Sequence, residues 1–210
     1  MITTAALSKL AEAGDVNSQF RLAHRNAFAR DPRDRDWKKA SDLWKAAAAQ
    51  GHVRAQFYLG TCYDFGQGVR KNARLAMHWY RRAAKGGYEV AQYNLGLGYR
   101  DGVGVRRSGA TAARWFRMAA IAGNPDAQSD LGFCLHEGVG VRRDLAEAAL
   151  WYRRAARSGL PRAQFNLGLC YVNGEGVPRS LSRARPWLLQ AASQRHAGAR
   201  LALSRMVRST

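Results

Sequence analysis

Small and apolar residues recur along this chain at helical spacing. The first stripe has the order i, i+4, i+7, i+8 and consists of Ala55, Leu59, Cys62 and Tyr63. A second stripe, with the order i, i+3, i+4, i+7, i+8, runs from Ala76 to Ala84. Each order places its residues on one face of an α-helix, so the pattern predicts two amphipathic helices joined by a glycine-containing loop.

The helix–loop–helix pattern returns every 36 residues. Four regular repeats occupy residues 55–90, 91–126, 127–162 and 163–198. Residues 18–54 form a divergent repeat, residues 1–17 an isolated second helix, and residues 199–210 an isolated first helix. A fixed period of this length is typical of solenoids, in which each unit completes its core against its neighbours. The sequence therefore predicts one all-α solenoid domain of twelve helices over residues 1–210.

The loops and helix starts have recurring residues of their own. A Gly-x-Gly-Val loop, whose first glycine suits a left-handed helix cap, begins at Gly66, Gly102, Gly138 and Gly174. Each second helix is preceded by a residue that caps helices well, namely Asp36, Asn72, Ser108, Asp144 or Ser180. Asp144 and Glu147 also match the capping-box pattern.

Glycines and tryptophans mark positions where the helices should pack closely. Glycine in a helix interior costs about 1 kcal/mol relative to alanine, so we expect helices to cross very closely at Gly60, Gly96, Gly132 and Gly168. The second helices are expected to bury their tryptophans and to end at Gly51, Gly87, Gly123 and Gly159. Arg195 takes this last position in the final repeat, so we expect a different turn there.

These motifs together resemble the Sel-1-like repeat family, which is related to tetratricopeptide repeats. The resemblance rests on an AQxxLGxxY helix, a GxGV loop, a polar cap, an AxxWYRRAA helix and a closing glycine, and covers residues 18–210. It implies a right-handed superhelix of antiparallel helix pairs whose first helices line a concave groove. It also implies a non-catalytic adaptor that assembles protein complexes, in bacteria often for signalling, envelope or host-interaction tasks.

The cysteines depart from one branch of that family. In a cysteine-rich secreted branch, described as penicillin-binding or hydrolysing, paired cysteines join the two helices of each repeat. Here Cys62, Cys134 and Cys170 share one first-helix position, and no second-helix cysteine is present to pair with them. We therefore predict that they are small buried hydrophobic residues, and a β-lactamase-like activity is the least favoured alternative.

Sequence motifs of enzymes, nucleotide sites and metal sites are missing. The loops do not extend to GxGxxG, no GxxxxGK[ST] or SxxK occurs, and His136-Glu137 lacks the second histidine of HExxH. The five histidines have no ligand spacing. The sequence therefore predicts no catalytic residue, no cofactor and no metal.

A candidate groove comes from the first-helix face opposite the buried stripe, at the third, seventh and tenth positions of each repeat. Its members are Phe57, Thr61, Asp64, Tyr93, Leu97, Arg100, Ser129, Phe133, His136, Phe165, Leu169 and Val172. An aromatic and aliphatic column of this kind suits a segment of a partner protein. Apolar residues at helical spacing are also often core, so packing against adjacent repeats is the alternative for the aromatics.

Basic residues recur in two further columns, the loop ladder and the second-helix ladder. The loop ladder consists of Arg70, Lys71, Arg106, Arg107, Arg142, Arg143 and Arg179. The second-helix ladder consists of Arg81, Arg82, Arg117, Arg153 and Arg154, with Lys45 before them. With 34 Lys and Arg against 15 Asp and Glu, the net charge is +19. This charge would match an acidic protein surface; a nucleic acid is the alternative partner, and its binding would weaken steeply with salt.

The compartment is predicted from absent signals. The N-terminal residues show no secretory signal, and no run reaches the roughly 18 apolar residues of a membrane-spanning helix. We therefore expect a cytoplasmic protein, or a periplasmic or secreted one if a signal has been removed. The sequence does not predict an oligomeric state.

Overall fold

The computed structural model describes residues 3–208, and the chain divides into two compact units, Met1–Arg107 and Ser108–Thr210. The first unit contains α1 (Thr4–Glu12), α2 (Val16–Ala27), the 3-10 turn η1 (Pro32–Asp34), α3 (Trp37–Ala49), α4 (Val53–Phe65), α5 (Ala73–Lys85) and α6 (Glu89–Asp101). The second contains α7 (Gly109–Ile121), α8 (Pro125–Glu137), α9 (Leu145–Arg157), α10 (Pro161–Asn173), α11 (Leu181–Ser193) and α12 (Ala197–Arg208).

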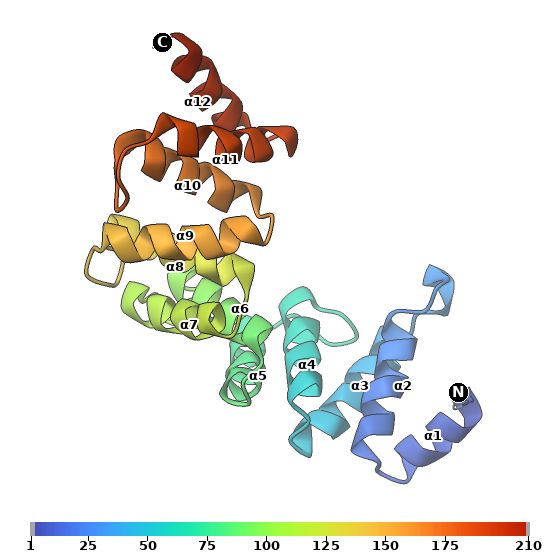
Figure 1. Cartoon of the computed structure of the whole chain (residues 1–210). Coiled ribbons are helices and arrows are strands. Elements are labelled where there is room, and N and C mark those ends of the chain that lie inside the picture. Colours follow the sequence, from blue (N-terminus) through green and yellow to red (C-terminus); the bar gives the residue numbers. More distant parts are fainter. Residues whose placement is uncertain (1–2, 209–210) are drawn as a thin grey trace. The chain divides into compact units, whose positions relative to one another are not determined.

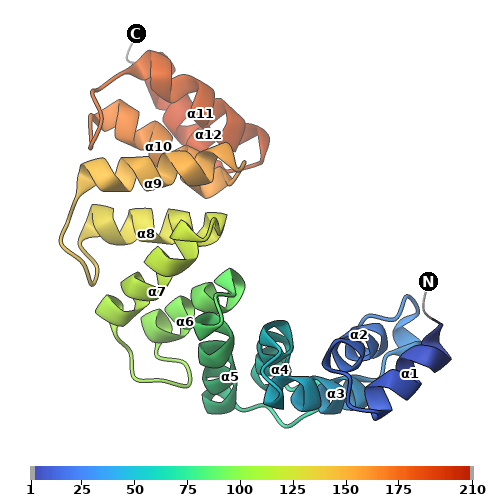
Figure 2. The same ribbon diagram turned by 60° about the horizontal axis from the view of Figure 1, so that its bottom comes forward.

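The all-α prediction is confirmed, since residues 3–208 form twelve α-helices and no strand. Within each unit, successive helices pack in chain order, for example α2 on α3 and α8 on α9 (Figures 1 and 2). Residues 1–2 and 209–210, which the sequence analysis assigns to the terminal half-repeats, lie outside the described residues. The single-domain organisation stays a prediction.

Each first helix of the regular repeats begins two residues earlier than predicted, at Val53, Glu89, Pro125 or Pro161. The residues just before the Ala-Gln pair explain this earlier start. The side chain of Asn124 accepts a hydrogen bond from the Ala127 N–H, and proline suits the first turn of a helix because its missing N–H is not needed there.

A buried glutamine joins each repeat to the one before it, a role that the sequence analysis missed. In every case the side-chain amide donates to a backbone carbonyl eight residues earlier, in the last turn of the preceding second helix, at 3.2–3.3 Å. The five glutamines are Gln19, Gln56, Gln92, Gln128 and Gln164, which are 3–8% exposed. Each of these carbonyls also accepts the N–H of the glycine that closes the turn, so the glutamine adds a second hydrogen bond to the same oxygen.

The mid-helix glycines Gly60, Gly132 and Gly168 are confirmed as places of close approach, but what approaches is a side chain of the second helix. A Cβ on Gly60 would lie 2.7 Å from Tyr80 Cδ1, and a Cβ on Gly132 equally close to Tyr152 Cδ1. The residue after each tryptophan is therefore the main core residue, and Tyr80 and Phe116 are more buried than Trp79 and Trp115. Only Trp151 among the predicted tryptophans of the regular repeats is fully buried.

The loop glycines have two separate roles. The first glycine of each loop is a left-handed C-cap, as predicted, with φ between 74° and 77°. The second glycine also has positive φ, and a Cβ on Gly68 or Gly176 would overlap the carbonyl of Trp37 or Leu145, the first residue of the preceding second helix. This second contact holds the loop against the previous repeat.

The predicted N-caps are confirmed at all five positions. Asp36, Asn72, Ser108, Asp144 and Ser180 each accept a hydrogen bond from the backbone N–H three residues later. The capping-box prediction is wrong. The side chain of Glu147 binds Arg117 and the Trp151 indole, and the Asp144 N–H donates to the carbonyl of Leu135.

The last second helix ends in the same way as the others, contrary to the sequence-based expectation. Arg195 has φ of 65°, and it is the only non-glycine residue with positive φ in the described chain. Its equivalent Gly159 has φ of 86°, with no atom within 4 Å of an added Cβ. An arginine side chain therefore fits, and the cost is in the backbone, because left-handed geometry is unfavourable for a residue that carries a Cβ.

We predict that Arg195→Gly stabilises the second unit by about 1 kcal/mol, because glycine adopts this geometry without strain. Urea unfolding followed by circular dichroism measures the change. The reverse substitution at the matched turn, Gly159→Arg, should destabilise by a similar amount. Equal stability of both variants and the parent protein would show that the turn carries no strain.

Candidate binding surface

Each unit has a hollow of about 270 Å³ between the first helices of two successive repeats. The hollow of the first unit is lined by residues that include Asp64, Met77, Tyr80, Asn94, Leu97, Asp101 and Val103. The hollow of the second unit is lined by residues that include Phe133, His136, Glu137, Tyr152, Asn166, Leu169 and Glu175. Most positions correspond two repeats apart, as in Tyr80 and Tyr152 or Asn94 and Asn166. The two hollows are therefore the same structural feature.

Five of the predicted groove residues line these hollows. They are Asp64 and Leu97 in the first unit and Phe133, His136 and Leu169 in the second. Phe133 is the most open of the five, with 51% of the residue exposed.

The other predicted groove residues lie elsewhere. Phe57 packs against the rings of Tyr80 and Tyr88, and Phe165 stacks on His196 with 4.5 Å between ring centroids. Ser129 is 2% exposed, since its short side chain cannot reach the surface from a position held elsewhere by aromatic residues.

Four further residues complete the predicted set. The Thr61 hydroxyl donates to the Tyr58 carbonyl at 2.7 Å, and Arg100 forms an ion pair with Asp101. Tyr93 and Val172 are half-buried. The continuous column predicted from helical spacing is therefore interrupted by packing, and what the structure forms instead is one separate hollow in each unit.

The tyrosines of the second helices reach the hollows and were missed by the sequence analysis. The mid-helix glycines make room for their rings, so the combination of the glycine and tyrosine columns was the available signal. The Tyr80 hydroxyl donates to Asp64 Oδ2 at 3.2 Å, whereas the Tyr152 hydroxyl has no hydrogen-bond partner in residues 3–208. Burial raises the pKa of both phenols, so both stay protonated near neutral pH.

His136 joins two carboxylates at the rim of the second hollow. Its Nδ1 lies 2.7 Å from Glu137 Oε1 and its Nε2 lies 3.1 Å from Glu175 Oε2. Partial burial disfavours the charged imidazolium, but the hydrogen bonds and charges of Glu175 and Glu137 together outweigh burial and raise the pKa of His136 above its ordinary value. Glu175 comes from the variable position of a Gly-x-Gly-Val loop, where the first hollow has Val103.

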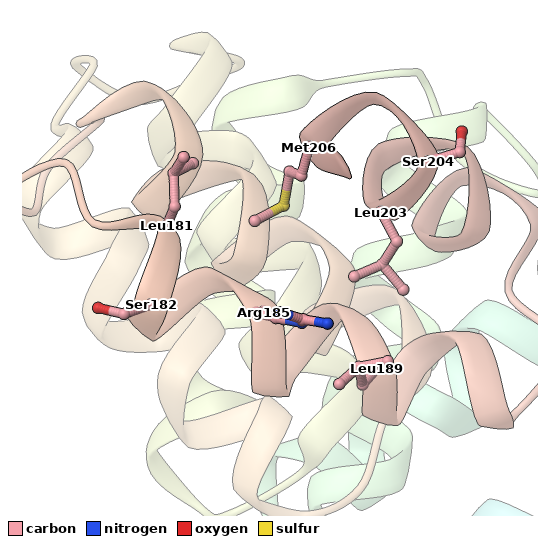
Figure 3. Close-up of a pocket in the computed structure, with 7 residues that line it drawn as sticks. All are labelled: Leu181, Ser182, Arg185, Leu189, Leu203, Ser204 and Met206. Carbon is pink, nitrogen blue, oxygen red and sulfur yellow. The ribbon is translucent and has the colours of Figure 1, made fainter. Parts of the chain in front are cut away.

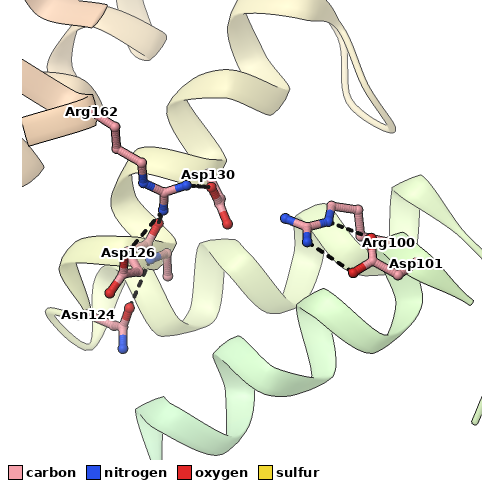
Figure 4. Close-up of polar contacts among 7 residues, drawn as sticks. Arg100, Asp101, Asn124, Asp126, Asp130 and Arg162 are labelled. Atoms are coloured by element: carbon pink, nitrogen blue, oxygen red, sulfur yellow. Dashed lines mark hydrogen bonds and ion pairs between the residues drawn. The ribbon is translucent and has the colours of Figure 1, made fainter. Parts of the chain in front are cut away.

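Two polar clusters lie near the ends of first helices (Figure 4). In the first unit, Arg100 forms a two-pronged ion pair with Asp101, at 2.8 and 3.0 Å. In the second unit, Arg162 of α10 binds Asp130 Oδ1 at 2.5 Å and the Asp126 carbonyl at 2.9 Å, both on α8. The Asp130 residue is only 8% exposed, so Arg162 offsets a buried charge between two repeats.

Most residues of the second-helix ladder have structural partners. Arg81 and Arg153 donate to Tyr99 and Tyr171 of the next first helix, at 2.8 and 3.3 Å. Arg82 and Arg154 lie over the tryptophans of their own helices, with the guanidinium carbon of Arg154 4.4 Å from the Trp151 ring centroid. These arginines recur as predicted, and their contacts with tyrosines and tryptophans give them a structural role.

The loop ladder is divided between structural and exposed residues. Arg143 Nε donates to the His136 carbonyl at 2.9 Å, and Arg179 does the same for Val172. Lys71 and Arg107 are exposed. The remaining members, Arg70, Arg106 and Arg142, are exposed and have no hydrogen bond or ion pair with the described residues.

The cysteines are buried and free, as predicted for Cys62, Cys134 and Cys170. Burial raises the pKa of Cys62 to about 12 and that of Cys170 to about 11. A thiol is a poor nucleophile compared with a thiolate, so these two side chains are unreactive near neutral pH.

A third hollow, of about 450 Å³, lies between α11 and α12 (Figure 3). Leu203 and Met206 extend from α12 toward α11, where Leu181, Arg185 and Leu189 complete the lining. It is the most apolar of the three and has no counterpart in register with the other two.

Metal and membrane sites were also sought. No cluster of three His, Cys, Asp or Glu side chains arranged to bind a metal ion occurs within residues 3–208. No helix in the same part of the chain has the length and apolar character needed to cross a bilayer.

The repeat motif matches a known family throughout most of the chain. The Sel1 repeat model matches residues 16–52, 53–88, 90–124, 125–160 and 161–196. The chain belongs to the Sel1 repeat family. The resemblance inferred from the sequence and the solenoid fold are thereby confirmed, with repeat boundaries close to the observed helix starts.

Solved structures agree with this assignment. A protective antigen of uropathogenic Escherichia coli with an SLR fold is 33% identical, with a TM-score of 0.91 over 98% of this chain and 44% of that one. A Sel1 repeat protein from Oxalobacter formigenes is 35% identical, with a TM-score of 0.84 over 97% of this chain and 58% of that one. This chain therefore spans about half the length of these two Sel1 repeat relatives.

A more distant similarity shows the fold alone. An immunity protein from Pseudomonas aeruginosa is 24% identical, with a TM-score of 0.52 over 88% of this chain and 66% of that one. Sel1 repeat proteins are generally protein-interaction scaffolds, which agrees in class with the function expected from the sequence.

We predict that Arg162→Met destabilises the second unit of this Sel1 repeat protein by about 2 kcal/mol, because the nearly buried Asp130 carboxylate loses its ion pair with Arg162. Urea unfolding measures the loss. Arg157→Met is the matched control, since Arg157 is exposed and unpartnered on α9. Adding Asp130→Asn to Arg162→Met should restore part of the stability. Equal stability of Arg162→Met and the control would show that the ion pair between Arg162 and Asp130 does not stabilise the fold.

Stability should also depend on the protonation of His136. Because its pKa is raised on folding, its contribution is complete below the unfolded pKa of about 6.5 and is lost as pH rises through the folded pKa. We expect a loss of less than about 1 kcal/mol between pH 6 and 8.5, because the ion pairs are partly exposed. The His136→Gln variant should lack this loss of stability between pH 6 and 8.5. If its stability changed with pH as much as that of the parent protein, His136 would not be the cause.

Proposed function

We propose that this chain is a non-enzymatic scaffold that binds a segment of a partner protein over the hollows between its first helices. The observation that carries the proposal is the recurrence of one hollow in both units at corresponding positions, with different side chains on the same frame. A repeated frame with variable lining is what a recognition surface needs, since the frame positions the contacts and the lining selects the partner.

Exposed apolar and polar groups meet in each hollow, which supports binding of a peptide segment. Leu97 and Leu169 provide apolar walls, and Asn94 and Asn166, one turn earlier on the same helices, offer amides. Extended or helical segments are commonly bound in this way, with backbone groups satisfied by side-chain amides and anchors seated between helices.

The second-helix ladder gives little support to nucleic-acid binding, which leaves the exposed loop residues, among them Arg70, Arg106 and Arg142, for that role. Arg81, Arg82, Arg153 and Arg154 are held by tyrosines and tryptophans, so their charges have structural partners on the protein itself. Phosphate binding needs arginines and lysines free to replace counterions. The proposal therefore takes a protein as the partner.

Site-specific photo-crosslinking tests this function. A benzoylphenylalanine residue at Phe133 in the native host should give covalent adducts with a defined protein, identified by mass spectrometry. Phe133 is 51% exposed, so the replacement should leave the melting temperature close to that of the parent protein.

The matched control places the same photo-residue at Leu150, which is 54% exposed on α9 and outside the hollow. We expect adducts from position 133 and none from position 150. Equal adducts from both positions, or none from position 133, would contradict a binding role for the hollow.

A further inference from the structure

We infer that the hollow of the second unit binds a cationic side chain, arginine or lysine, of the partner segment. This inference rests on the proposed function and names the chemistry that the hollow selects. Its volume of about 270 Å³ is below the 300–1,000 Å³ typical of pockets for whole small molecules, so it suits a single side chain.

The first observation is the charge of the hollow. Glu137 of α8 and Glu175 of the loop after α10 line it, and no lysine or arginine is among its lining residues. Ionised carboxylates are acceptors only, so a ligand between them must supply N–H donors. Asn166 and Asn173 add amide oxygens that can accept further hydrogen bonds from the same group.

The second observation is independent of the carboxylates. Tyr152 is only 3% exposed and lines the hollow, yet its hydroxyl makes no hydrogen bond to any of residues 3–208. The oxygen is therefore open to a hydrogen bond from a group that enters the hollow. A guanidinium or ammonium group in the hollow would donate to this oxygen.

The hollow of the first unit provides a natural comparison. There the Tyr80 hydroxyl already binds Asp64, and Asp101 is paired with Arg100. Val103 stands where the second hollow has Glu175. The first hollow therefore also has two carboxylates, Asp64 and Asp101, but one accepts from a tyrosine and the other is paired with an arginine.

His136 makes the site sensitive to pH. Glu137 on its own helix and Glu175 on the loop after α10 face its two nitrogens, and the Tyr152 ring on α9 lies 6.5 Å away. Arg143 approaches only the His136 backbone carbonyl. When His136 is protonated it neutralises one of the two carboxylates. When it is neutral, both charges are available, so cation affinity increases as His136 loses its proton.

The probe for the test is the blocked tripeptide acetyl-Gly-Arg-Gly-amide, titrated into the isotopically labelled full chain at pH 8 and observed by NMR. We expect saturable shifts at Asn166, Asn173 and Tyr152, and none at Asn94 or Tyr80 of the first hollow. The same peptide with citrulline, which lacks the charge, should give no saturable shift. Equal responses to the two peptides, or shifts at both hollows alike, would overturn the inference.

Two substitutions identify the groups responsible. Glu175→Gln should weaken binding by about tenfold, the effect expected for one charge-assisted hydrogen bond. The matched control is Glu12→Gln, which makes the same charge change at an exposed residue of α1. Tyr152→Phe removes only the hydroxyl and should weaken binding severalfold, so it tests the site even if Glu175→Gln does not fold. Unchanged affinity in Tyr152→Phe would overturn the inference.

The pH dependence gives a third readout. Affinity for the arginine peptide should be higher at pH 8 than at pH 6, and His136→Gln should remove most of that difference. An affinity that is equal or lower at pH 8 would overturn the inference. Crosslinking at position 133 without arginine-specific shifts would support the scaffold function and exclude the cation site. Arginine-specific shifts without crosslinking at position 133 would support the cation site and contradict the scaffold function.

Discussion

The buried hydrogen bond from the glutamine of each first helix to the end of the preceding helix fixes how successive repeats stack. Near the end of each second helix one carbonyl accepts the N–H of the turn glycine, and its second lone pair can accept a donor from the next first helix. The glutamine amide is this donor five times with nearly the same distance. The start of each first helix is therefore fixed relative to the end of the helix before it.

The hollows follow from this register. Once successive first helices are held at one spacing, Gly60 or Gly132 leaves room for the tyrosine of its own repeat, and that ring reaches the same place in each case. The frame is therefore set by packing and hydrogen bonds that any repeat can make. What differs between hollows is a few side chains at the rim, such as Val103 in one and Glu175 in the other.

The sequence predicted the features that depend on local geometry. The period, the left-handed loop glycines, the N-caps and the buried cysteines all follow from residues within one or two turns of helix. It missed contacts that join separate helices. Arg81 reaches Tyr99 and Arg117 reaches Glu147, so arginines expected as a free ladder are held, and the expected capping box does not form.

Helical spacing also could not tell which groove residues stay accessible, because it gives the direction of a side chain and not its length or neighbours. Ser129 and Phe133 both point away from the buried stripe, yet the first is covered and the second is open. The expectation of a different turn at Arg195 was wrong for a related reason. A turn held by the hydrogen bonds on either side keeps its backbone geometry, and the residue at its apex accepts the strain.

The net charge of the chain and the charge of the second hollow act on a partner over different distances. A net charge of +19 repels polycations at a distance, but that field is screened over about 8 Å at physiological salt. Two carboxylates at the rim of the second hollow act at contact distance, which is shorter than the screening length. A partner compatible with both would be neutral or acidic over most of its length and carry an isolated arginine or lysine, which is a more selective requirement than either charge alone would impose.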